Sequence, residues 1–333
     1  MPLHAPPAFD VAAIGNAIVD VIAPADDAFL GRHDLRKGAM TLVDEARAGS
    51  LYADMAPGVE TSGGSAGNTI AGVASLGGRG AYIGKVAADQ LGEVFRHDVR
   101  ALGVHYETAP LSGGPSTARC LINVTPDGHR TMATWLGAAT ALGPEDVDEA
   151  VIADAFVTYL EGYLFDAPRA RDAFHVAAAA ARQAGRLTAI TISDVFVAER
   201  WRDDLIAFLD KVDVVFANEN EVKSLFQTDD FEAASSSLAG TVEIAVVTRS
   251  EHGSLVRCGG EVHQIPAFPV EHVLDTTGAG DQYAAGFLFG LARGRPLDVC
   301  GALGALAAWE VIGHYGPRPQ APLEALAQAR GLL

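Results

Sequence analysis

Short apolar runs rich in Val, Ile and Ala recur along the chain, separated by turns and amphipathic segments. A buried strand, a turn at Gly15-Asn16 and a second strand are predicted by "FDVAAIGNAIVDVIA". A glycine turn followed by a helix is predicted by "GGSAGNTIAGVASLGG", where apolar residues recur at near-helical spacing. Two β-rich runs flank a turn signal in "TARCLINVTPDGHRTMATWL", which predicts a hairpin.

From residue 151 onward, strand and helix patterns alternate. Strands are predicted by "AFVTYLEG", "RLTAITISD", "VDVVFANENE" and "EIAVVTR", and a helix by "RARDAFHVAAAAARQAG". This alternation indicates an α/β fold with a mostly parallel central sheet and helices on both faces. The N-terminal hairpins do not fit that pattern and predict a small β-sheet beside it. Since ligands of such folds bind beyond the carboxyl ends of the strands, the loops "GGSAGN", "NENE" and "TTGAGD" are expected at that edge.

The segment "DTTGAGDQYAAGFL" concentrates glycine and acid directly before an apolar stretch. Apolar residues follow Gly280 at helical spacing, so Gly278 to Asp281 form the predicted start of a helix. The free N–H groups there, with no large side chains nearby, make an anion site. Asp281 then has two interpretations. It complements the helix dipole, or it is a general base placed beside the anion site.

Composition narrows the function classes. The chain has 333 residues, 49% of them hydrophobic and 20% charged, which is typical of a globular protein. A net charge of −18 argues against nucleic acid and anionic membrane surfaces as partners, although a small anion needs only local positive potential. No apolar run approaches membrane-helix length, and "MPLHAPPAFD" shows no secretory signal, so we expect a cytoplasmic enzyme.

Other chemistries lack their motifs. Cys120, Cys258 and Cys300 are scattered and expected to be reduced, and none of the ten histidines lies in an HExxH motif. The phosphate-binding motif GxxxxGK[ST] and the protein-kinase HRD and DFG pair are absent. The dinucleotide motif GxGxxG fails because Tyr283 stands where the third glycine belongs, which disfavours a nicotinamide-dependent oxidoreductase.

Two segments together, "GGSAGNTIAGVASLGGRGAYIGKV" and "DTTGAGDQYAAGFL", resemble the two signatures of the ribokinase–adenosine kinase family of PfkB-type carbohydrate kinases. "GNAIVD" and "NENE" extend the resemblance over essentially the whole chain. It implies a ribokinase-like fold and phosphoryl transfer from ATP, with Mg²⁺, to an alcohol. It also implies a large α/β domain of residues 1–16, 43–104 and 138–333, and a small β lid of residues 17–42 and 105–137, which excludes water when it closes.

The resemblance implies roles at the start of the predicted helix. Asp281 matches the catalytic base, which takes a proton from, or orients, the hydroxyl that attacks the γ-phosphate. The backbone of Gly278, Ala279 and Gly280 matches the anion hole for charge that develops on the transferring phosphoryl group.

Sugar-binding positions of the family match Asn16, Asp20, Gly63, Gly64 and Asn68. An aspartate accepts hydrogen bonds from two vicinal hydroxyls, asparagine adds a donor and an acceptor, and glycines let the backbone approach the ring. The alternative for Asp20 is a charged residue on the exposed face of a strand.

Nucleotide and metal positions match a third group of residues. Asn218 and Glu221 match the NxxE element, which organises magnesium partly through water, while the alternative is a helix cap followed by a helix-start carboxylate. Thr248 and Gly253 fall where the nucleotide's ribose and adenine lie. Arg130 lies on the lid hairpin and reaches the phosphates when the lid closes, or else is a solvated lid residue.

Asp275 and Thr277 match positions that help to bind a monovalent cation such as K⁺ in many relatives. The alternative is that Asp275 caps the local backbone.

The substrate is left open between two classes. "GNAIVD" and "SDVFVAERWRD" resemble the adenosine kinase-like branch, which favours adenosine and its 5′-hydroxyl over a free sugar such as ribose or fructose. The same polar residues serve both substrates, because adenosine and ribose share a ring with vicinal hydroxyls. A non-catalytic sugar- or nucleoside-binding protein on this fold is a further alternative, and both monomers and lid-paired homodimers occur among the relatives.

Overall fold

A central sheet of eight strands organises the structure, a computed structural model that describes residues 6–333. Six strands from β11 to β5 run parallel, and β12 and β13 add an antiparallel hairpin at one edge, so the predicted α/β fold is confirmed. In spatial order the strands are β13 (Glu261–Ile265), β12 (Ser254–Cys258), β11 (Ile244–Thr248), β10 (Val214–Asn218), β9 (Leu187–Thr191), β8 (Ala155–Glu161), β1 (Phe9–Ile14) and β5 (Gly80–Ile83).

Side chains of the central sheet alternate between two apolar cores. Along β1, Ala12 and Ile14 point into one core, whereas Val11 and Ala13 point into the other, because successive strand residues face opposite sides. The first core packs against α5 (Glu149–Ala153), α6 (Pro168–Gln183), α7 (Val195–Arg200), α8 (Arg202–Leu209), α9 (Glu219–Phe226) and α10 (Phe231–Ala239). The second packs against α3 (Ser65–Ser75), α4 (Gln90–Ala101), α11 (Ala279–Ala292) and α12 (Leu297–Val311), with α13 (Leu323–Ala329) beyond them on α3 and α12. Short 3-10 helices are η1 (Gly137–Ala141), η2 (Pro144–Asp146), η3 (Gly162–Asp166) and η4 (Ser250–His252).

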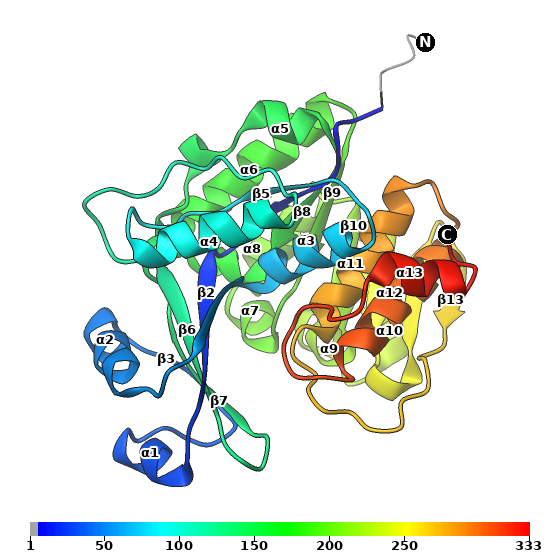
Figure 1. Cartoon of the computed structure of the whole chain (residues 1–333). Coiled ribbons are helices and arrows are strands. Elements are labelled where there is room, and N and C mark those ends of the chain that lie inside the picture. The colour runs from blue at the N-terminus through cyan, green and yellow to red at the C-terminus, as the bar shows by residue number, and fades with distance from the viewer. Residues whose placement is uncertain (1–5) are drawn as a thin grey trace.

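A second, five-stranded sheet projects from one side of the α/β body (Figure 1). Its order is β3 (Met40–Leu42), β7 (Arg130–Trp135), β6 (Ala118–Val124), β2 (Ile18–Pro24) and β4 (Val59–Gly63). The predicted hairpin is β6 and β7, and β2 pairs with β6 in parallel. Helix α2 (Glu45–Asp54) packs against β6 and β7, and α1 (Asp27–Arg32) follows β2.

Strand β4 departs from the domain boundaries that the resemblance implies. Residues 59–63 fall in the segment expected to belong to the large domain, yet they pair antiparallel with β2 in the small sheet. The polar composition of this strand, "VETSG", gives no buried-strand pattern, and only its first residue, Val59, is exposed at the edge of the sheet. The small sheet therefore draws on residues 59–63 as well as on the two predicted lid segments.

Among residues 6–333, no helix combines the length and the hydropathy needed to cross a membrane.

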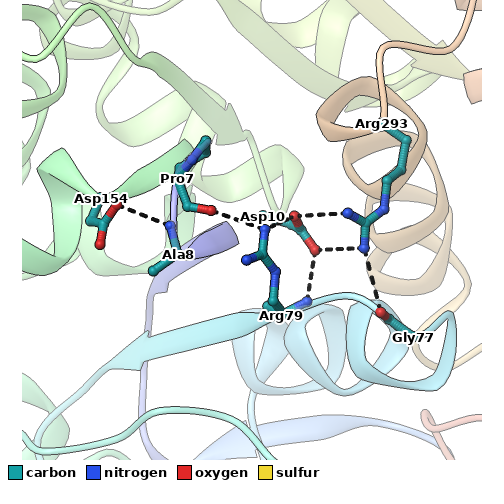
Figure 2. A network of polar contacts seen from close by, with 7 residues as sticks. All are labelled: Pro7, Ala8, Asp10, Gly77, Arg79, Asp154 and Arg293. Atoms are coloured by element: carbon teal, nitrogen blue, oxygen red, sulfur yellow. Dashed lines mark hydrogen bonds and ion pairs between the residues drawn. The ribbon is translucent and has the colours of Figure 1, made fainter. Parts of the chain in front are cut away.

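The buried carboxylate of Asp10 ties three elements together at the amino end of β1 (Figure 2). Its oxygens accept bonds from the backbone N–H of Arg79 at 2.8 Å, from the Arg79 guanidinium at 3.1 Å and from the Arg293 guanidinium at 3.0 Å. Arg79 precedes β5 and Arg293 ends α11. The network thus fixes the far end of the helix whose start carries the "GAGD" motif.

We expect Asp10→Ala to lower the free energy of unfolding by about 1–3 kcal/mol, because the substitution leaves the Arg79 N–H without its acceptor and two guanidinium groups without their counter-charge. Urea denaturation measures the effect. The control is Asp203→Ala, which removes a carboxylate whose side chain is 94% exposed and is expected to cost less than about 0.5 kcal/mol. Equal stability of the two variants would contradict the tethering of β1, β5 and α11 through Asp10.

Candidate active site

A cavity of about 530 Å³ lies where the carboxyl ends of the central strands face the small sheet. Helix α11 begins at its floor, and β2, β6 and β7 contribute its opposite wall. Most of the residues expected from the family signatures meet here: Asp20, Gly64, Asn68, Arg130, Asn218, Glu221, Thr248, Thr277, Gly278, Ala279, Gly280 and Asp281 line the cavity. The cavity is not lined by Asn16, Gly63, Gly253 or Asp275.

The start of α11 exposes backbone donors to the cavity. Gly278 adopts a left-handed conformation with φ +78°, and a Cβ there would lie 2.6 Å from Pro317, so only glycine fits. The Ala279 N–H donates to the Thr276 carbonyl at 3.2 Å. Within the described part of the chain, the N–H groups of Gly278, Gly280 and Asp281 have no protein acceptor. Three donors at a helix start suit a phosphate group.

The Asp281 carboxylate faces the same cavity and is held from α3. Ser65 Oγ donates to Oδ1 at 2.6 Å and Asn68 Nδ2 donates to Oδ2 at 3.1 Å. Burial raises the pKa of Asp281 to about 6, while these two hydrogen bonds act in the opposite direction. The group is therefore ionised at neutral pH and has a pKa close enough to neutrality to accept a proton. Ser65 belongs to the "GGSAGN" motif but was not predicted as a site residue.

Asp20 of β2 is the second cavity carboxylate. Burial raises its pKa to about 6, although the positive charges of Arg318 and Arg130 lower it. The expected alternative, a charge on an exposed strand face, is excluded because Asp20 is only 8% exposed. Gly63 does not line the cavity but leaves room for the Asp20 carboxylate, since a Cβ on Gly63 would lie 2.4 Å from it.

A third carboxylate, Glu161 at the end of β8, was missed by the sequence analysis. It is buried and accepts bonds from Asn16 Nδ2 at 2.6 Å, from Asn16 N at 3.3 Å and from Ala66 N at 2.9 Å. Burial raises its pKa to about 7. The Asn16 side-chain amide therefore donates to Glu161, and the pair fixes the β1–β2 turn to the start of α3.

Arg318 was also missed, because it lies in the irregular segment after α12. Its Nε donates to Asn68 Oδ1 at 3.3 Å and its Nη1 donates to Ser62 Oγ at 3.0 Å. The first bond orients the Asn68 amide so that its NH₂ group faces Asp281. Arg318 also places a positive charge near Asp20.

Asn218 and Glu221 form a reciprocal capping box at the start of α9. Asn218 Oδ1 accepts from the Glu221 N–H at 2.9 Å, and the Glu221 carboxylate accepts from Asn218 N at 2.9 Å and Nδ2 at 2.6 Å. Glu221 also lines the cavity, and burial raises its pKa to about 7. Within residues 6–333 no Lys or Arg charge acts on the Glu221 carboxylate. A buried carboxylate without a counter-charge fits Mg²⁺ that is held mostly through water.

The two residues expected at the nucleotide differ in position. Thr248, at the end of β11, lines the cavity. Gly253 does not. It turns the chain into β12 with φ +79°, and a Cβ there would lie 2.0 Å from the Ile265 carbonyl oxygen. Ser254, the first residue of β12, forms a hydrogen bond of 2.6 Å through its Oγ with the Tyr283 hydroxyl.

Asp275 precedes residues 278–281, the predicted anion-binding loop, and pairs with Arg130 from the small sheet. It also accepts bonds from the N–H and the hydroxyl of Thr277, at 2.9 and 2.6 Å. The local capping expected as one alternative is therefore present, and Arg130 is a buried rather than a solvated lid residue.

Comparison with known proteins agrees with this geometry. The model of the pfkB family carbohydrate kinases matches residues 10–324. The chain belongs to this family. It is therefore a phosphotransferase that acts on an alcohol group of a small molecule and uses ATP, and neither a non-catalytic binder nor an oxidoreductase.

Three relatives illustrate its neighbourhood. The structure of adenosine kinase from Sinorhizobium meliloti is 55% identical, with a TM-score of 0.89 over 97% of this chain and 99% of the other. A probable sugar kinase protein from Rhizobium etli CFN 42 is 52% identical, with a TM-score of 0.91 over 98% and 100%. Adenosine kinase 2 of Arabidopsis thaliana is 25% identical over 91% of this chain and 93% of its own length.

We expect kcat/KM of this PfkB kinase to fall as the pH drops through about 6, where Asp281 and Asp20 become protonated. Ser65→Ala removes a hydrogen bond that stabilises ionised Asp281, so its pKa rises and the acid limb moves to higher pH. Initial-rate pH profiles measure the shift. The control, Ser237→Ala, alters an exposed serine bonded only to its own helix and leaves the profile unchanged. If the acid limb of the Ser65→Ala profile does not shift, Asp281 is not the group whose protonation lowers kcat/KM.

Proposed function

We propose that this kinase transfers the γ-phosphate of ATP to the 5′-hydroxyl of adenosine. The observation that carries the proposal is a pair of neighbouring rows on the cavity face of the small sheet. Asp20, Cys120 and Thr134 pair across β2, β6 and β7 and form a polar row. Two residues further along the strands, Ile122 pairs with Met132 and forms an apolar row on the same cavity wall.

These rows suit the two halves of a nucleoside. Residues two apart on a strand lie about 7 Å from each other, which is comparable to the separation of a ribose from the base it carries. The Asp20 carboxylate accepts hydrogen bonds from the vicinal ribose hydroxyls, and Ile122 and Met132 offer an apolar surface to a flat purine. A free sugar leaves that apolar row without a partner.

Sequence similarity supports the same choice, because two of the three relatives described above are named adenosine kinases. The probable sugar kinase from Rhizobium etli, at 52% identity, keeps a free sugar such as ribose or fructose as the second candidate.

Asp281 is the proposed base. With the ribose hydroxyls on Asp20, the 5′-hydroxyl points to the floor of the cavity, and the Asp281 carboxylate orients it and takes its proton as the bond to phosphorus forms. Ser65 and Asn68 hold the carboxylate while this happens. The N–H groups of Gly278 and Gly280 stabilise negative charge that builds on the transferring phosphoryl group.

The rest of the cavity binds the nucleotide. The part of the cavity that we assign to ATP is lined by Thr248, the Asn218–Glu221 pair and Arg130 of β7. Glu221 would hold Mg²⁺ through water, and the metal would supply positive charge that neutralises the ATP phosphates. The small sheet covers the reacting groups and excludes water, which otherwise competes with the 5′-hydroxyl as acceptor.

A substrate panel tests the proposal. We expect ADP release from magnesium-ATP with adenosine, and kcat/KM for ribose and fructose at least about 100-fold lower, because a sugar does not use the apolar row. A coupled ADP assay with adenosine, other nucleosides, ribose and fructose measures this. Turnover of ribose without turnover of adenosine would establish the sugar kinase alternative.

Asp281→Asn tests the base separately. We expect it to retain ATP binding while kcat falls by about 100-fold or more, because the amide accepts no proton. Steady-state kinetics and nucleotide titration measure the two properties. Asp298→Asn, at the exposed first turn of α12, serves as the control and keeps normal turnover. Near-normal activity of Asp281→Asn would remove it from the chemical step.

A further inference from the structure

Asp275 has a complete set of hydrogen-bond donors. Its Oδ1 accepts from the Thr277 N–H and hydroxyl, at 2.9 and 2.6 Å. Its Oδ2 accepts from the Gly316 N–H at 3.0 Å and from Arg130 Nη1 at 2.5 Å. A carboxylate offers about four lone-pair sites, so none is left over for a further ligand.

This arrangement does not fit a monovalent cation, which is one of the two roles that the family resemblance leaves open for Asp275 and Thr277. A cation needs free oxygen lone pairs, but Thr277 and Gly316 turn donors toward the carboxylate. A fixed positive charge is also already present, since the Arg130–Asp275 ion pair is buried, with each side chain 8% exposed. A second cation on the same carboxylate would be repelled.

We propose that the Arg130 guanidinium supplies the positive charge behind the anion-binding loop, so that phosphoryl transfer in this enzyme is independent of K⁺. The inference rests on the proposed role of Gly278–Asp281 in binding the transferring phosphoryl group. Asp275 is a positioning residue, because it holds Thr277 and Arg130 and lies outside the cavity lining.

The location of Arg130 gives the pair a second consequence. Arg130 is the first residue of β7, so its charge reaches Asp275 only when the small sheet lies over the cavity. The turn before β7 is also close to the segment that follows α12, since a Cβ added to Gly128 would lie 2.6 Å from the Tyr315 hydroxyl oxygen. The Arg130 Nε is buried and has no acceptor within residues 6–333, so this residue of the cavity wall keeps one unpartnered donor. Lid closure and completion of the charge at the phosphate site are thus one event.

Cation replacement tests the proposal directly. Wild-type kcat/KM is expected to be equal within about twofold in potassium chloride and in tetramethylammonium chloride of the same ionic strength. Larger activation by K⁺ would overturn the proposal. A failure of all acceptors to react would instead count against the proposed function, and the melting temperature then provides the test, because a bound cation stabilises the folded protein. We expect the wild-type melting temperature to agree in the two salts within about 1 °C, and a greater stabilisation by K⁺ would contradict a saturated Asp275.

Variants separate the ion pair from a general effect of charge. In tetramethylammonium chloride, Arg130→Gln is expected to lower kcat by about tenfold or more, and Arg130→Lys to recover part of that loss because it keeps the charge. Asp275→Asn is expected to lower kcat by a smaller factor in the Arg130→Gln variant than in the wild type, since the two residues act as a pair. Arg169→Gln, which breaks the exposed pair with Glu145, is the matched control and leaves kcat unchanged. Fully additive losses would refute the pairing.

Discussion

The site depends on the hydrogen bonds that join the first turn of α3 to the first turn of α11. Ser65 and Asn68 donate to Asp281, and Gln282 returns a bond from its side-chain amide to the Asn68 carbonyl at 2.9 Å. Two helix N-termini thereby meet at the carboxyl edge of the sheet, where their free N–H groups and dipoles favour negative charge. Glu161 and Arg318 hold the α3 turn in place, and the small sheet forms the opposite wall of the cavity.

Burial of several charged carboxylates costs free energy unless each one has hydrogen-bond donors or positive charges as partners. Asp20, Glu161 and Asp281 all have pKa values raised by burial, and the charge of Asp281 raises those of the other two further. At Asp20 this effect is offset by Arg318 and Arg130, which come from the segment after α12 and from the small sheet. In the proposed function, substrate hydroxyls and the magnesium–nucleotide complex would add the remaining partners, so the electrostatics of the site would be complete only with substrates bound and the small sheet over them.

The sequence predicted the parts of this account that local pattern determines. The start of α11, the strand–helix alternation and the β6–β7 hairpin follow from apolar periodicity and turn residues, which act over a few positions. The Asn16–Glu161 bond joins residues 145 apart, and Arg318 reaches Asn68 across 250 positions. No local pattern encodes such contacts. An acid that ends an otherwise apolar strand, as Glu161 ends "AFVTYLEG", was the one available signal for the missed carboxylate.

The central claim is that Asp281 and the two rows of the small sheet together select a nucleoside 5′-hydroxyl. A crystal structure with adenosine and a non-hydrolysable ATP analogue tests it most directly. The account predicts the 5′-hydroxyl within hydrogen-bond distance of the Asp281 carboxylate, the ribose on Asp20 and the purine against Ile122 and Met132. Adenosine bound with its 5′-hydroxyl away from Asp281, or with its base off the apolar row, would contradict it.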